Sequence, residues 1–212
     1  MIDSKMITFF SLLAILCLVF LAAVLVMSIW RLVAGRLPAN VQMVRDGIGQ
    51  AALWMAFAVA ATATFGSLWL SEVEKFPPCH FCWLQRYFMY PQTLLLGAAA
   101  IGRWMWMRWI SIPMVVIGAG ISTYHYLLQR FPDDVAASCS DDTPCTAVWV
   151  WQYHFLSIPG MAWVGFVTIA VLLLLAQRSA SGADGADDGF PMERDGESTD
   201  ADGILAAATE AE

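Results

Sequence analysis

Five long runs of apolar residues determine what this chain can fold into. They cover Ile7–Trp30, Ile48–Leu70, Trp83–Ile101, Trp109–Leu128 and Ile158–Ala176, and contain 24, 23, 19, 20 and 19 residues. An α-helix rises about 1.5 Å per residue, so each run is long enough to cross the roughly 30 Å hydrocarbon core of a bilayer. The sequence therefore predicts an all-α membrane protein with five transmembrane helices and excludes a water-soluble globular domain.

The charge balance separates the last part of the chain from the rest. The formal net charge is -7, yet residues 179–212 hold ten of the eighteen acidic residues and one of the eleven basic residues, which leaves the rest of the chain slightly basic. Such a polar, acidic segment buries too little apolar surface to offset the entropy of ordering, so we expect a disordered tail. No basic cluster indicates a nucleic-acid partner.

The arginines between the apolar runs indicate how the chain is oriented. Arg31, Arg36 and Arg45 follow the first run, Arg103 and Arg108 the third, and Arg178 the fifth, so all six lie on one face, whereas the other face has only Lys5, Lys75 and Arg130 as basic residues. Cytoplasmic loops of membrane proteins carry an excess of Lys and Arg. We therefore expect a multi-pass protein of the inner (plasma) membrane, with its N-terminus outside and its C-terminus in the cytoplasm. The first run exceeds the roughly 7 to 15 apolar residues of a secretory signal, so we expect a retained helix.

A Cys-x-x-Cys motif stands at the start of the third run, in the segment "FPPCHFCWLQR". Pro77 and Pro78 suit the beginning of a helix, so Cys79 and Cys82 should lie in its first turn. The unpaired N–H groups and the positive end of the helix dipole favour a thiolate there. The motif predicts a redox-active dithiol, and a permanent structural disulfide is the alternative.

A second cysteine pair lies in the loop between the last two runs, in the segment "CSDDTPC". The predicted orientation places Cys139 and Cys145 on the outer, oxidising side of the membrane together with the first pair, and disulfides persist on that side. A turn between them can bring the two sulfurs together. The polar surroundings should leave this loop pair accessible to a partner protein.

Two ionisable residues lie near the outer ends of their runs. Apart from Cys and Tyr, Arg86 and His125 are the only ionisable residues within the five runs. Arg86 follows Cys82 by four residues and should project from the same helix face. Charged groups within membrane spans are costly and mark functional sites. We expect Arg86 and His125 to share a site with the Cys-x-x-Cys motif, with Gln85 contributing hydrogen bonds.

These residues resemble the disulfide-bond-formation protein B family (DsbB), especially its shorter BdbC-like branch. The resemblance runs from about Ile48 to Ala176, and its most specific parts are "PCHFCWLQR" at Pro78–Arg86 and "YHYLLQRFP" at Tyr124–Pro132. It implies a four-helix transmembrane bundle in residues 48–178. Residues 1–47 would then form an additional N-terminal transmembrane helix and a cytoplasmic loop, and residues 179–212 an acidic cytoplasmic tail.

The resemblance also implies an activity. Family members pass electrons from an extracytoplasmic thioredoxin-like (DsbA-like) thiol oxidase to a membrane quinone, of the ubiquinone or menaquinone type, and so support protein disulfide bond formation. By this resemblance Cys79 and Cys82 are the pair that quinone reoxidises, with Cys82 nearest the ring. Arg86 would stabilise negative charge on quinone or thiolate, and His125 would lie near the quinone.

The loop pair takes its expected role from the same resemblance. Cys139 would form the mixed disulfide with the partner, and Cys145 would pair transiently with Cys79. The spacing of the loop pair is shorter than in the best-studied branch, which leaves the order of attack by its two sulfurs open. The helix expected at Ile7–Trp30 has no counterpart in the four-helix family.

Three other classes compete with this interpretation. A vitamin K epoxide reductase-like thiol oxidase also uses two cysteine pairs, but there the loop pair precedes the Cys-x-x-Cys motif, which is the reverse of the order seen here. A non-enzymatic membrane protein could hold structural zinc on four cysteines. A small transporter with static disulfides is the third class, and the lack of acidic residues within the runs disfavours it. We expect no metal site.

Overall fold

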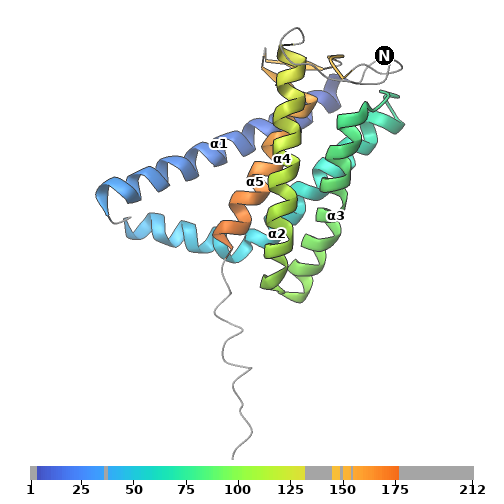
Figure 1. Ribbon diagram of the computed structural model, residues 1–212. Coiled ribbons are helices and arrows are strands. Elements are labelled where there is room, and N and C mark those ends of the chain that lie inside the picture. The colour runs from blue at the N-terminus through green and yellow to red at the C-terminus, as the bar shows by residue number, and fades with distance from the viewer. Residues whose placement is uncertain (1–3, 36–37, 132–144, 149, 154, 177–212) are drawn as a thin grey trace, which may run out of the picture. The chain divides into compact units, whose positions relative to one another are not determined.

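The computed structural model describes residues 4–35, 38–131, 145–148, 150–153 and 155–176. Five α-helices dominate this part of the chain (Figure 1): α1 (Ser4–Ala34), α2 (Ala39–Glu72), α3 (His80–Gly102), α4 (Arg108–Arg130) and α5 (Ile158–Leu175). A short 3-10 helix, η1 (Met105–Met107), connects α3 to α4. The chain divides into two units, residues 1–178 and 179–212, and the acidic tail expected to be disordered lies outside the described residues.

Helices α2 to α5 form a four-helix bundle. Each packs against two neighbours, in the cyclic order α2, α3, α4, α5, and α1 packs against α5 from outside this ring. The bundle core is made of large apolar side chains that are almost entirely buried, among them Leu96, Val115, Phe166, Ile169 and Leu172. The predicted all-α fold with one additional N-terminal helix is confirmed.

Four helical segments are long and apolar enough to cross a membrane: Lys5–Ala34, Asn40–Glu72, Met105–Arg130 and Ile158–Leu175. Among the described helices α3 does not reach the same hydropathy, although its 23 residues span about 34 Å. The cause is a row of polar side chains that includes Gln85, Arg86 and Gln92. These side chains face neighbouring helices rather than lipid, because Gln85 and Gln92 are buried. The chain is a multi-pass membrane protein, and α3, one of the four helices of the ring, buries polar side chains against its neighbours.

A small antiparallel hairpin precedes α5 and was not predicted. Its strands are β1 (Trp151–Gln152) and β2 (Leu156–Ser157). The Tyr126 ring at the end of α4 stacks on Trp151 with 6.3 Å between centroids, and the Tyr126 hydroxyl donates to the carbonyl of Phe155 at 3.0 Å. The hairpin is thereby fixed against the end of α4 that carries His125.

Close packing of α4 on α5 depends on Gly118. A Cβ at this position would overlap the ring of Phe166, which is fully buried, whereas a Cβ at Gly120 would meet nothing within 4 Å. We expect Gly118→Ala to lower the free energy of unfolding by about 1–3 kcal/mol through overpacking. Gly120→Ala is the matched control on the same helix and should leave stability unchanged or slightly raised. Thermal unfolding of the purified protein in detergent would show this, and equal melting temperatures for the two variants would contradict it.

Candidate functional site

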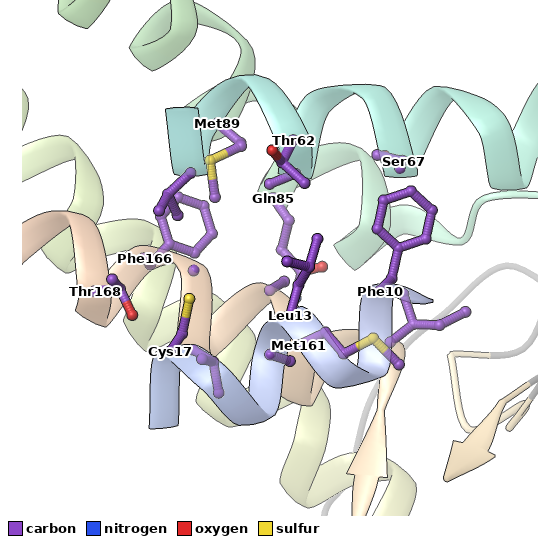
Figure 2. Close-up of a pocket in the computed structure, with 18 of the residues that line it drawn as sticks. Phe10, Leu13, Cys17, Thr62, Ser67, Gln85, Met89, Met161, Phe166 and Thr168 are labelled. Atoms are coloured by element: carbon purple, nitrogen blue, oxygen red, sulfur yellow. The ribbon is translucent and has the colours of Figure 1, made fainter. Parts of the chain in front are cut away.

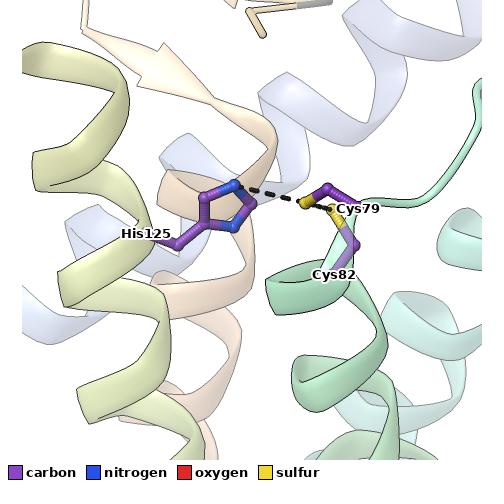
Figure 3. A group of neighbouring side chains, drawn as sticks. All are labelled: Cys79, Cys82 and His125. Carbon is purple, nitrogen blue, oxygen red and sulfur yellow. Dashed lines mark hydrogen bonds between the residues drawn. The ribbon is translucent and has the colours of Figure 1, made fainter. Parts of the chain in front are cut away.

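The two cysteines of the Cys-x-x-Cys motif meet at the beginning of α3. Cys79 is the extended residue just before the helix, and its carbonyl accepts the N–H of Trp83 at 3.1 Å, which starts the helix. Cys82 lies in the first turn. The two Sγ atoms are 3.0 Å apart and both thiols are free (Figure 3). This separation is about 1 Å longer than a disulfide bond, so a small side-chain rotation closes it.

His125 of α4 approaches Cys79 from the opposite helix (Figure 3). Its Nε2 lies 3.6 Å from the Cys79 Sγ, and its Nδ1 lies 3.5 Å from the side-chain nitrogen of Gln85 on α3. The ring is buried, as is Gln85. When the Gln85 amide donates to Nδ1, the ring hydrogen is on Nε2 and points at the sulfur. Gln85 therefore orients His125 as a donor to a Cys79 thiolate.

The site stabilises negative charge on Cys79. The hydrogen bond from the Cys82 thiol, together with the hydrogen bond from His125, outweighs burial and lowers the pKa of Cys79 from 9.0 to about 4. The positive end of the α3 dipole acts in the same direction. Reduced Cys79 is therefore a thiolate at neutral pH, and the thiolate is the form that exchanges disulfides.

We expect replacement of His125 by alanine to make the reactivity of Cys79 dependent on pH. In the reduced protein the Cys79 thiolate persists above pH about 4, so its alkylation rate should be nearly flat between about pH 5 and pH 8. Without His125 the hydrogen bond from Cys82, the largest cause of the lowered pKa, remains, so the pKa of Cys79 should rise from about 4 and the pH at which the rate begins to fall should rise with it. Site-resolved mass spectrometry of iodoacetamide-treated protein measures this rate.

The adjacent histidine provides the control for this prediction. His80 is the first residue of α3 and follows Cys79 directly. Its side chain is exposed and makes an edge contact with the Phe81 ring. His80→Ala should retain the flat profile of the unmodified protein. An identical profile in His125→Ala and His80→Ala would show that His125 does not stabilise the thiolate.

Cys145 of the loop pair lies in the same buried cluster as Cys79. The cluster contains Cys79, Leu128 and Cys145, with Phe81 and Cys82 packed against it. Cys145 is disulfide-bonded, while Cys139 lies outside the described residues. The side chain of Gln129 donates to the carbonyl of Ala147 at 3.0 Å and ties the segment after Cys145 to the end of α4. The fold thus brings one cysteine of the loop pair against the first cysteine of the motif.

Cys82 faces a different region, an apolar cavity of about 720 Å³ (Figure 2). Residues of α1, α2, α3 and α5 line this cavity, and those from α3 are Cys82, Gln85, Arg86, Met89 and Tyr90. Arg86 brings a guanidinium group into an otherwise apolar wall. The two cysteines of the motif therefore have different surroundings. Cys79 packs with Cys145, whereas Cys82 lines the cavity.

Ser67 of α2 holds Arg86 in place and was missed by sequence reasoning. The Arg86 Nε donates to the Ser67 hydroxyl at 2.9 Å, and another guanidinium nitrogen donates to the Ser67 carbonyl at 3.0 Å. The guanidinium carbon also lies 5.2 Å from the centre of the Trp83 ring. The only signal in the sequence was a serine within an apolar run, which also occurs in ordinary helix packing.

The ligand atoms of Cys79, Cys82 and His125 lie within 4.8 Å of one another, so this trio could hold a soft metal ion. The zinc alternative requires four cysteine ligands, whereas this trio has two cysteines and a histidine. Cys145, which the zinc alternative would need as a free thiolate, is disulfide-bonded. The geometry is equally that of a dithiol beside a general acid or base.

A dithiol with a stabilised thiolate, set in a helical membrane bundle and packed against Cys145 of the loop, defines a membrane thiol–disulfide oxidoreductase. Residues 49–176 match the family described as Disulfide bond formation protein DsbB. The chain belongs to the DsbB family.

The relatives place the chain near the branch that the sequence resembles. It is 42% identical over 130 residues to the probable disulfide formation protein C 1 of Bacillus anthracis, and 36% identical over 130 residues to the disulfide bond formation protein C of Bacillus subtilis. Each match covers 61% of this chain and 94% of the relative. No solved structure matches the chain. The predicted family and its BdbC-like branch are confirmed, and all of α1 and of the acidic tail lie outside the residues that match the family.

Proposed function

We propose that this protein reoxidises an extracytoplasmic thioredoxin-like thiol oxidase and passes the electrons to a membrane quinone. The observation that carries this proposal is that the two sulfurs of the Cys79–Cys82 pair lie in different surroundings. Cys79 packs with Cys145 of the loop pair, while Cys82 and Arg86 line the apolar cavity. Such an arrangement gives one dithiol an electron donor on one side and an electron acceptor on the other.

The cavity fits a quinone. Its volume of about 720 Å³ is within the range of roughly 300 to 1,000 Å³ that is usual for small-molecule sites. Its walls are apolar apart from a few polar groups, and the Arg86 guanidinium, fixed by Ser67, is placed to hold a carbonyl oxygen. A bound quinone would supply the acceptor for the two electrons and one proton that leave when the Cys79 thiolate and the Cys82 thiol become a disulfide, and its second proton would come from solvent.

The chain's own sulfurs carry the remaining steps by exchange. A reduced partner gives two electrons to the loop disulfide through a mixed disulfide at Cys139, and the partner leaves oxidised. The Cys145 thiolate then attacks Cys79 and breaks the Cys79–Cys82 bond, so Cys82 leaves as a thiolate, and Arg86 lines the same cavity. Attack by Cys139 on Cys145 restores the loop disulfide and releases Cys79 as a thiolate, which Cys82 and His125 stabilise.

Charge placement supports an outward orientation of the cysteines. Arg103 ends α3, and Arg108 begins α4 and donates to the carbonyl of Ala176 after α5 at 3.3 Å. These arginines therefore lie at the helix ends opposite Cys79. Because basic residues favour the cytoplasmic side, the proposal places both cysteine pairs on the outer face of the plasma membrane, where disulfides persist.

The test is an absorbance assay of the purified protein with a reduced thioredoxin-like substrate and added quinone. We expect one quinone to be reduced for each substrate disulfide formed, and no reaction when the substrate is supplied already oxidised. Absence of quinone reduction with the reduced substrate would contradict the proposal. Metal analysis provides an independent check, because one zinc per chain without any disulfide would favour the structural zinc alternative.

A further inference from the structure

Helix α1, which has no counterpart in the four-helix core, forms one wall of the cavity that Cys82 and Arg86 enter. Its lining residues run from Ile7 to Ala23, and four of them, Phe10, Leu13, Cys17 and Phe20, recur every three to four positions along the helix. Figure 2 shows Leu13 and Cys17 directed into the space between α1 and the opposing Gln85, Met89 and Phe166. This is the spacing of a single helix stripe.

The other faces of α1 have different surroundings. Ile7, Ser11 and Ala14 are buried, and Ile7 and Ala14 also line the cavity. Leu12 is 54% exposed and does not line the cavity. Helix α1 therefore packs on α5, lines the cavity along a broad face and leaves Leu12 to the surrounding lipid.

Helix α1 contacts α2 next to the serine that binds Arg86. The Phe10 ring packs on Gly66 of α2 so closely that a Cβ there would lie 3.0 Å from a ring carbon. Gly66 immediately precedes Ser67, whose hydroxyl and carbonyl accept hydrogen bonds from Arg86. Phe10 therefore lies one residue along α2 from the serine that holds the guanidinium group.

The cavity is elongated along α1. Its lining extends from Ile7 to Ala23 on α1 and from Ser71 back to Met55 on α2, and sixteen helical residues correspond to about 24 Å. The polar groups of α3, which include Cys82 and Arg86, lie toward one end of this slot, and the walls farther along are apolar except for Thr62 and Thr168. A slot of this form suits a molecule with a polar ring at one end and a long hydrocarbon tail.

We infer that α1 builds a binding subsite for the isoprenoid tail of the quinone, with Leu13 and Cys17 in its wall. This inference rests on the proposed quinone acceptor. The ring would lie against Arg86, and the tail would run between α1, α2 and α5. Matched relatives have 94% of their length within the aligned 130 residues, so this wall is an addition to the family core.

The experiment measures equilibrium binding of two quinones to the purified full-length protein in nanodiscs. One quinone has no tail and the other has a long isoprenoid tail. We expect Leu13→Trp, which fills the slot, to weaken long-tail binding at least tenfold while leaving tail-less binding within twofold. The matched control is Leu12→Trp, on the lipid-facing stripe, which should change neither affinity.

The outcomes separate this inference from the proposed function. Unchanged long-tail affinity in Leu13→Trp, with normal binding by the unmodified protein, would overturn the tail subsite and leave the quinone acceptor standing; the slot would then hold a lipid acyl chain. Failure of the unmodified protein to bind either quinone would overturn both. If Leu13→Trp binds neither quinone, Cys17→Phe deeper in the slot replaces it, and selective loss of the long-tail quinone is again the supporting result.

Discussion

A protein carrying Cys82→Ser is expected to lose quinone-dependent oxidation of its thioredoxin-like substrate down to the background rate. The Cys79 and Cys82 sulfurs are 3.0 Å apart, and only a second sulfur can close the disulfide that stores the two electrons. Cys79→Ser should have the same effect. Absorbance of the quinone and thiol counting of the substrate would both show the loss.

Cys139→Ser is the informative comparison because it removes a different step. We expect this variant to fail in turnover with the partner, yet its reduced Cys79–Cys82 pair should still react with added quinone. A Cys82→Ser protein that oxidises the partner at the normal rate would refute the assignment of the motif. Equal loss of the quinone step in Cys139→Ser would show that the two pairs do not act separately.

Replacement of Arg86 by alanine is expected to raise the apparent KM for quinone tenfold or more and to change the KM for the partner little. Arg86 lines the cavity and is held by two hydrogen bonds from its guanidinium group to Ser67. A charged hydrogen bond contributes about 1.5–3 kcal/mol, which corresponds to a factor of roughly 10 to 150. Steady-state titration of each substrate at saturating levels of the other measures the two constants.

Two further variants test the cause of that effect. Arg86→Lys keeps the positive charge but cannot make both guanidinium hydrogen bonds to Ser67. Its KM for quinone should therefore lie between those of the unmodified protein and Arg86→Ala. Arg31→Ala removes an exposed arginine at the far end of α1 and should change neither constant. A larger rise in the KM for the partner than for quinone in Arg86→Ala would count against a role of Arg86 at the quinone.

Those features that depend on residues close together along the chain could be predicted from the sequence. Apolar length predicted the helices, and the two prolines before Cys79 predicted a helix start at the motif, where α3 begins at His80. Spacing also placed Arg86 one turn after Cys82, and both line the same cavity. These features follow from helix periodicity alone.

Relations between helices could not be predicted in this way. The pairing of Arg86 with Ser67, the orientation of His125 by Gln85, and the packing of Cys145 on Cys79 depend on how each helix is rotated about its axis. In a membrane span nearly every face is apolar, so the hydrophobic pattern gives little information on rotation. For the same reason the sequence assigned α1 no role, although one of its stripes lines the cavity.

The most direct test of the account is a single turnover of the reduced Cys79–Cys82 pair with quinone, in protein whose loop cysteines carry Cys139→Ser and Cys145→Ser. Quinone absorbance and mass spectrometry of alkylated thiols are followed in the same sample. The account predicts that one quinone is reduced for each pair of Cys79 and Cys82 thiols that disappears. Thiols that persist beside unreacted quinone would contradict it.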